Sequence, residues 1–340
     1  MKFLLKFLSA LILLNILFYL YLLVYKNISY PFQAGPQFDD NIRTNYQDYI
    51  NENHPSMVLI GDSMLQRGVN SDKLGQELNQ KILNIALPGS GSTLWYLIIK
   101  NDILLASTPP AYLVLFFRDS ELTAPGLRVQ GQYLEQIDEF AASSDRLLIQ
   151  RAYINQMNPM EIMAEKYFPP YSLRWKIRST LDYYIRYSLP TYILACPQTC
   201  TNQAMARLFG ENNLEPKILS NAIDAGDDFL YTNKALNFNQ QVEISFLPEI
   251  IRLCRENHIQ LIAVQMKTLR FPKASLEPPT LKSYRVDLKE YLQKNNSIYL
   301  DFSNDSYIHN NLFFDPLHFN DEGKEVFTDL LAKTLRPHLR

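Results

Sequence analysis

Near residue 60 the chain reads Met57-Val58-Leu59-Ile60-Gly61-Asp62-Ser63. The four apolar residues predict a buried strand, and the glycine lets the backbone turn tightly directly after it. The serine then lies where a strand ends and a helix begins, which is the edge of a parallel sheet where ligands collect. We therefore expect an exposed hydroxyl that can act as a nucleophile. An ordinary helix N-cap at Asp62 or Ser63 is the alternative use of these residue types.

Short apolar runs alternate with helical stretches both before and after a long middle segment. We expect helices at about 71–80, 94–105, 246–257, 281–294 and 322–335, and strands at 57–61, 82–86, 112–117, 260–266 and 298–302. A β-α-β-α-β order favours a parallel sheet with helices on both faces. The sequence therefore predicts an α/β domain over residues 56–340.

The middle segment, about residues 121–241, lacks this alternation and predicts a mostly helical insertion. It is dense in aromatic residues, and Arg174, Lys176, Arg178 and Arg186 are interleaved with them. One interpretation is a helical cap with an aromatic core and a solvated basic face. The other is a lid that covers the active site or contacts anionic lipid headgroups.

The N-terminus predicts a membrane anchor over residues 1–26. Phe7 to Tyr25 carries no charge, and its 19 residues suffice to cross a hydrocarbon core of about 30 Å. Lys2 and Lys6 precede this run, so we expect a single-pass protein with a cytoplasmic N-terminus and an extracytoplasmic domain, periplasmic or on the cell surface. A cleaved signal peptide is the alternative, which the long apolar run and the lack of a small-x-small site after Val24 disfavour. Residues 27–55 are expected to form a tether and a helix at about 41–51.

The composition excludes some functions. A net charge of −2 and a pI of about 6.2 give no basic footprint for nucleic acid. The three cysteines suggest a local Cys196–Cys200 disulfide, with Cys254 buried and free. No second cysteine pair or nearby histidine completes a zinc site, so we expect neither a metal nor another cofactor.

A second motif near the C-terminus, Asp315-Pro316-Leu317-His318, supplies the partners that a serine nucleophile needs. Residues three apart can face the same side, so Asp315 can hold the His318 imidazole. With Ser63 they provide a nucleophile, a general base and an orienting carboxylate, the set used for acyl transfer through a serine ester. Taken alone, an acid beside a histidine can equally be a surface hydrogen bond.

At these motifs the chain resembles the SGNH/GDSL hydrolase family. The first family motif matches residues 61–64, the last matches 315–320, and residues 84–90 match the second. The resemblance covers about 57–117 and 261–335, and it implies a three-layer α/β/α flavodoxin-like sheet. It also implies that Gly89 donates an oxyanion-hole amide, although Gly91 could serve instead.

The third motif departs from the family pattern Gly-x-Asn-Asp. Here the matching residues are Phe116-Phe117-Arg118-Asp119, so Asp119 aligns and Arg118 replaces the asparagine. Arg118 could donate to an oxyanion, bind an anionic substrate group, or form a salt bridge with Asp119 or Asp62 without taking part in chemistry.

The leading hypothesis is an extracytoplasmic serine acyl-ester hydrolase or O-acyltransferase that acts on cell-envelope polysaccharide or lipid-linked material. Membrane-anchored members of the family in envelope polysaccharide acylation have a similar layout. Its expected catalytic residues are Ser63, Asp315 and His318, and its expected oxyanion and substrate-binding residues are Gly89, Arg118 and Asp119.

Two other functions stay open from the sequence. One is a non-catalytic binding partner of a membrane acyltransferase or a polysaccharide export system, in which Arg118 is a binding group. The other is a phosphodiesterase with a metal held by Asp62, Asp315 and His318, although three such residues are a thin ligand set.

Overall fold

The computed structural model describes residues 2–25, 30–36, 38, 42–131, 133–188, 192, 195, 197, 199–201, 203, 223–271 and 273–339. Its centre is a five-stranded parallel sheet with the strand order β2-β1-β3-β4-β5. The strands are β1 (Met57–Gly61), β2 (Ile82–Ala86), β3 (Tyr112–Phe117), β4 (Gln260–Gln265) and β5 (Ile298–Asp301). This order is flavodoxin-like, so the predicted fold class is confirmed.

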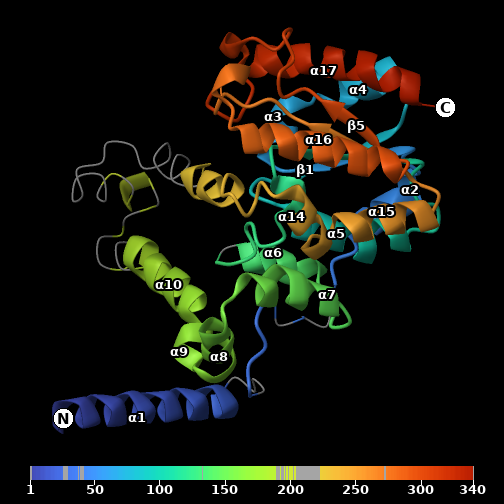
Figure 1. The fold of residues 1–340 in the computed structure, drawn as a ribbon. Helices are drawn as coiled ribbons and strands as arrows, with labels where there is room; N and C mark the ends of the chain where they lie inside the picture. The colour runs from blue at the N-terminus through green and yellow to red at the C-terminus, as the bar shows by residue number, and fades with distance from the viewer. Residues whose placement is uncertain are drawn as a thin grey trace.

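Helices cover both faces of the sheet (Figure 1). One face packs against α5 (Ser92–Asn101), α15 (Leu247–Glu256) and α16 (Pro279–Lys294), and the other against α3 (Ser63–Gly68), α4 (Ser71–Leu78) and α17 (Asp321–Leu335). Strand β1 alternates between them, with Val58 and Ile60 in the first core and Met57 and Leu59 in the second. Every residue of β1 is buried, which agrees with its continuous run of apolar residues.

The element boundaries differ from the sequence predictions by a few residues. The helix before the sheet, α2, covers Asn45–Asn53 and therefore begins and ends later than expected. Helix α5 ends at Asn101 and is followed by a short 3-10 turn, η1 (Ile103–Leu105). Helix α14 (Phe238–Ile244) was not predicted.

The insertion is helical in its described residues, but its first part belongs to the main core. After the short 3-10 turn η2 (Glu121–Thr123) come the helices α6 (Tyr133–Phe140) and α7 (Arg146–Leu148). They are followed by a π-helical turn, η3 (Ile149–Tyr153), and a 3-10 turn, η4 (Ile154–Gln156). Phe140 and Tyr153 lie in the same buried cluster as β1 and β3. The remainder forms an outer unit of α8 (Pro159–Tyr167), α9 (Pro169–Ser172), α10 (Arg174–Tyr183) and η5 (Tyr184–Ser188), and residues 223–230 return to the domain as a helix.

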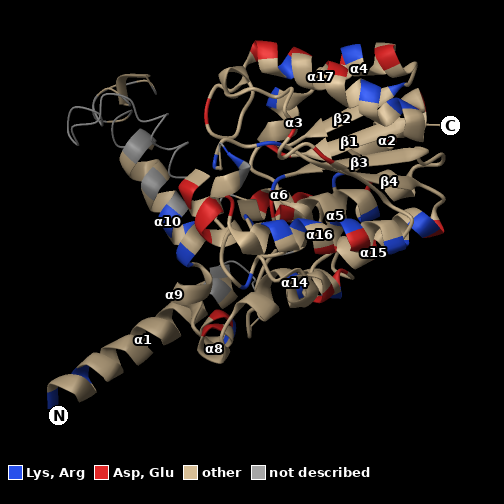
Figure 2. Cartoon of the chain, turned by 45° about the horizontal axis from the view of Figure 1, so that its top comes forward, with Lys and Arg blue, Asp and Glu red and all other residues tan. Residues whose placement is uncertain are grey.

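Helix α1 (Lys2–Tyr25) lies outside the α/β body, and α8 and α9 lie between the two (Figure 1). Its stretch Lys2–Tyr21 has a mean hydropathy of 2.2 and is not buried by the rest of the chain. Figure 2 shows that charged residues on α1 occur near its N-terminus. By length and composition α1 fits a membrane anchor or a signal sequence.

The segment after α1 packs against the outer unit of the insertion. The Phe32 N–H donates to the Lys166 carbonyl at 3.0 Å. The Tyr30 ring contacts the rings of Tyr19 and Tyr167, with centroids 4.7 and 6.3 Å away. Tyr30 and Phe32 are therefore held against the outer unit and α1 by these contacts.

Cys254 is buried with a free thiol, as predicted, and burial raises its pKa to about 12. Cys200 is disulfide-bonded, but Cys196, the partner expected from the sequence, lies outside the described residues.

Gly323 joins α17 to the loop that carries the second motif. A Cβ at this position would lie 2.1 Å from the Leu312 carbonyl oxygen. We expect Gly323→Ala to destabilise the protein by about 1–3 kcal/mol, because backbone atoms must move apart to accept the methyl group. Thermal unfolding of the full chain would measure this, with Lys333→Ala on the exposed face of the same helix as the control. Equal unfolding temperatures for the two variants would contradict the prediction.

Candidate active site

Ser63 is the first residue of α3, directly after the carboxyl end of β1. Asp62 caps this helix, since its Oδ1 accepts the Met64 N–H at 2.8 Å. The Met64 amide is thereby occupied, whereas the Ser63 N–H has no internal acceptor among the described residues. Asp62 is therefore the helix cap, and the Ser63 side chain is available for other contacts.

The structure brings the three expected catalytic residues into one hydrogen-bonded chain. Ser63 Oγ lies 2.8 Å from His318 Nε2, and His318 Nδ1 lies 2.6 Å from Asp315 Oδ2. An ionised carboxylate can only accept, so Nδ1 carries the proton and Nε2 is left to accept from the serine hydroxyl. His318 is 8% exposed and Ser63 is partly exposed, so the hydroxyl is reachable while the ring is held.

The carboxylate of Asp315 is fixed by its own loop. Its Oδ1 accepts the backbone N–H groups of Leu317 and His318, both at 2.8 Å. Burial raises the pKa of Asp315, but the hydrogen bonds from the His318 ring and from these two amides outweigh it and hold the pKa below its ordinary value. Asp315 therefore stays charged at neutral pH and can stabilise a protonated imidazole.

The loop after β2 is held against the end of β1. The Gly61 carbonyl accepts the Leu87 N–H at 2.9 Å and the Ser90 hydroxyl at 3.3 Å, and the Trp95 indole N–H donates to Ser90 Oγ at 2.8 Å. Gly89 lies within this loop at φ +78°, a conformation that favours glycine. Gly89 and Ser63 thus follow neighbouring strands at one edge of the sheet. The oxyanion role of Gly89 stays a prediction.

Arg118 makes an ion pair that the sequence did not reveal. It is 2% exposed, and its Nη1 donates to Asp227 Oδ1 at 2.6 Å, whereas Asp119 Oδ2 lies 4.0 Å away. Arg270 also pairs with Asp227, and Asp119 accepts the Tyr231 hydroxyl at 2.6 Å. Among the three uses expected for Arg118, the contacts fit a salt bridge, but with a residue of the insertion as the main partner. No motif marks Asp227, so local sequence could not identify it.

Electrostatics keep this arginine charged. Burial alone would lower the pKa of Arg118, but the neighbouring Tyr231, Asp119, Glu121 and Asp227 raise it above its ordinary value. The guanidinium therefore remains a cation in a buried site.

Sequence reasoning also missed Glu121. This residue is 1% exposed, and its Oε2 accepts the Arg118 backbone N–H at 3.3 Å. Burial, together with the nearby charge of Asp62, raises its pKa to about 8, despite the opposing charges of Arg118 and Arg128. Nothing in the sequence of a short turn indicates that its glutamate is buried.

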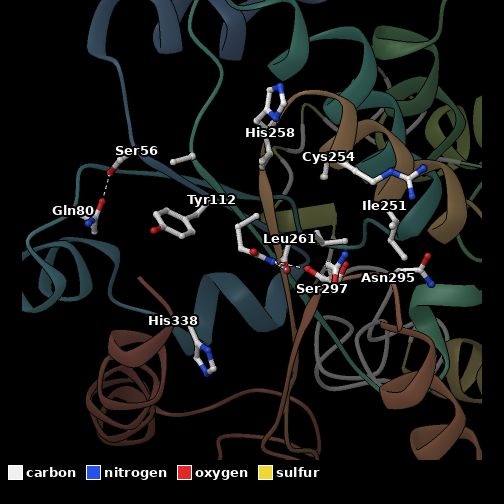
Figure 3. A pocket seen from close by; sticks show the side chains of 15 residues that line it. Ser56, Gln80, Tyr112, Ile251, Cys254, His258, Leu261, Asn295, Ser297 and His338 are labelled. Atoms are coloured by element: carbon white, nitrogen blue, oxygen red, sulfur yellow. Dashed lines mark hydrogen bonds between the residues drawn. The ribbon is translucent and has the colours of Figure 1, made fainter. Parts of the chain in front are cut away.

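A cavity of about 620 Å³ lies elsewhere, at the amino ends of the strands. Figure 3 shows its lining, which includes Ser56 and Tyr112 near the starts of β1 and β3, and the hydrogen bond between Ser56 and Gln80. Because Ser63 follows the carboxyl end of β1, this cavity is not part of the Ser63 site. In the described ranges, no group of three or more His, Cys, Asp or Glu residues is placed to hold a metal ion.

No family model matches the chain, and no curated protein matches it. Among solved structures, a GDSL-like lipase from Bacteroides thetaiotaomicron is similar at 11% identity and a TM-score of 0.38, covering 87% of this chain and 98% of its own. A protein assigned as an acylhydrolase, from Bacteroides fragilis, has 14% identity and a TM-score of 0.38, with coverages of 84% and 88%. Similarities this distant carry no conclusion about the activity of this chain.

The strand order and the hydrogen-bonded residues can be compared with the predicted resemblance. A serine after β1 faces a histidine and an aspartate from the loop before α17, across the point where the strand order reverses. The strand order and the meeting of Ser63, His318 and Asp315 agree with what the SGNH/GDSL resemblance implies. Membership of that family stays a prediction.

The raised pKa of Glu121 predicts a pH-dependent stability. The folded state holds this proton up to pH of about 8, whereas the unfolded chain releases it near 4.5. Stability from this group is therefore lost progressively as the pH rises between those values, by up to roughly 5 kcal/mol. We expect Glu121→Gln to flatten the decline of the unfolding free energy between pH 6 and 8.5, measured by urea unfolding. Glu290→Gln, an exposed residue of α16, is the control and should leave the decline unchanged. Parallel pH profiles for wild type and Glu121→Gln would contradict this.

Proposed function

We propose that this protein is a membrane-anchored serine acyl-ester hydrolase or O-acyltransferase that acts on cell-envelope polysaccharide or lipid-linked material. The observation that supports it most is the continuous hydrogen-bonded chain from Ser63 Oγ through His318 to Asp315. A helix cap or a surface hydrogen bond explains each motif separately, but neither explains their convergence across the fold.

In the proposed reaction Ser63 Oγ attacks an acyl carbonyl while His318 Nε2 takes the hydroxyl proton. The N–H groups of Ser63 and Gly89 are the proposed donors to the oxygen that becomes negative. His318 then returns the proton to the departing alcohol, which leaves the acyl group on Ser63. Water or a sugar hydroxyl, deprotonated by His318, releases the acyl group in the second half of the reaction.

Arg118 receives a different role from the one expected of the family asparagine. Its guanidinium is engaged by Asp227, so we assign it to holding the helical residues 223–230 against the carboxyl end of β3. Asp119 supports the same contact through Tyr231. In this proposal both residues position the site and do not touch the substrate.

The proposed location follows from α1. With Lys2 and Lys6 before the apolar stretch, the positive-inside rule keeps the N-terminus in the cytoplasm and the domain outside. A domain held at the outer face meets polymers and lipids of the envelope, and it can receive or deliver acyl groups beside a membrane acyltransferase.

A fluorophosphonate probe tests the nucleophile. We expect it to label the wild-type chain and Ser71→Ala, a control serine at the start of α4, and to leave Ser63→Ala unlabelled, because only an activated serine forms the adduct. Labelling is read by intact-protein mass spectrometry. Equal labelling of wild type and Ser63→Ala would remove the enzymatic proposal and favour a non-catalytic binding partner.

Asp315→Asn tests the orienting carboxylate. The asparagine amide would donate to Nδ1, which forces the proton onto Nε2 and prevents that atom from accepting the Ser63 hydrogen. We expect the probe to react about 10³–10⁴-fold more slowly at pH 7, while the fold is retained as judged by circular dichroism. A labelling rate within a few-fold of wild type would show that Asp315 does not orient the histidine.

A further inference from the structure

A second, smaller cavity of about 190 Å³ lies between the outer helical unit and the α/β body. Several parts of the chain line it. They are the segment after α1, the start of α6, the region of η3 and η4, and the helices α8 to α10, which contribute Glu165, Ser172 and Trp175. Figure 1 places α8 and α9 on the side of the body that faces α1, so the cavity lies on that side too.

One polar atom in its lining is left without a partner. The Trp175 indole N–H is buried and makes no hydrogen bond within the described part of the chain. Buried indole N–H groups normally find an acceptor, so an unpaired one that lines a cavity indicates a ligand or a water molecule.

The cavity also offers unused hydrogen-bonding groups. In the described ranges the side chains of Gln33, Gln130 and Glu135 make no hydrogen bond or ion pair. Together with the indole they supply both donors and acceptors beside an aromatic ring.

Donors and acceptors beside an aromatic ring fit one ring of a carbohydrate. A sugar presents an apolar face that can lie on an indole, and hydroxyls around it that both donate and accept. An acyl chain would leave the buried indole N–H unpaired, which is costly. The cavity is smaller than a pocket for a drug-sized ligand, so its volume suits a single sugar ring and not a lipid tail.

The cavity connects to the candidate active site through one short segment. A Cβ on Gly131 would lie 3.9 Å from the Trp175 ring, and Tyr133, two residues later, approaches Gly89 so closely that a Cβ there would lie 2.8 Å from the tyrosine ring. Gly131 therefore neighbours the cavity, and Tyr133 neighbours the loop of Gly89 that follows β2.

We propose that this cavity is a subsite for one sugar residue of the polymer, with Trp175 as its platform. The inference rests on the proposed function, since it assigns the polysaccharide as the substrate held on the anchor side of Ser63.

The test uses the full chain in lipid nanodiscs, with the tetrasaccharides of N-acetylglucosamine and of glucose as probes. We expect saturable binding of at least one of them by calorimetry, and an accompanying change in tryptophan emission. The chain has two tryptophans, and Trp95 is fully buried and remote from solvent, so the change should come from Trp175. Trp175→Phe should weaken binding by about tenfold or more and lose the emission change.

Two further variants keep the result interpretable. Gln130→Ala removes a cavity amide that makes no internal bond, and it should weaken binding without lowering the unfolding temperature. Gln240→Ala, exposed on α14, is the matched control and should bind as wild type does.

Failure of this inference and failure of the proposed function are distinguishable. Ser63→Ala should still bind sugar, and Trp175→Phe should still react with the fluorophosphonate. The subsite is overturned if neither tetrasaccharide binds the wild type, if Trp175→Phe binds unchanged, or if lauric acid binds with the same dependence on Trp175 and the sugars do not.

Discussion

Close packing around Gly61 is the constraint on which the site depends. A side chain here would have its Cβ 2.9 Å from the Leu65 Cβ and 3.0 Å from the Phe116 Cβ, so α3 and β3 reach their present positions only beside a glycine. The same residue's carbonyl accepts the two hydrogen bonds that hold the loop of Gly89. One small residue thus sets the distances among the nucleophile, the expected oxyanion donor and the end of the third strand.

Much of this arrangement could be predicted because its signals are local. The buried strands β1 and β3 are continuous apolar runs, and both were placed with their observed bounds. The serine and the Asp315–His318 pair could be named because each sits in a short motif. Their meeting in space then follows from the parallel sheet, which puts the ends of its strands at one edge.

What escaped prediction depends on contacts between distant residues. Nothing at position 227 indicates that its carboxylate pairs with Arg118, which is 109 residues earlier in the chain. The division of the insertion was hidden for the same reason: α6 is amphipathic, but only packing shows that Phe140 joins the core of the sheet while α8 to α10 stay outside. The altered third motif was visible in the sequence, yet the use of Arg118 is set by residues from elsewhere in the fold.

The packed segment after α1 has a mechanical consequence. The backbone bond from Phe32 to Lys166 and the ring contacts of Tyr30 with Tyr19 and Tyr167 tie this segment to both α1 and the outer helical unit. In a protein anchored as proposed, these contacts would limit how far the outer helical unit moves from the end of α1 and so restrict the height and tilt of the domain. Under the proposed function, the choice of substrate would then depend partly on which groups reach that height above the bilayer. Lengthening the segment would change the reach of the site without altering its chemistry.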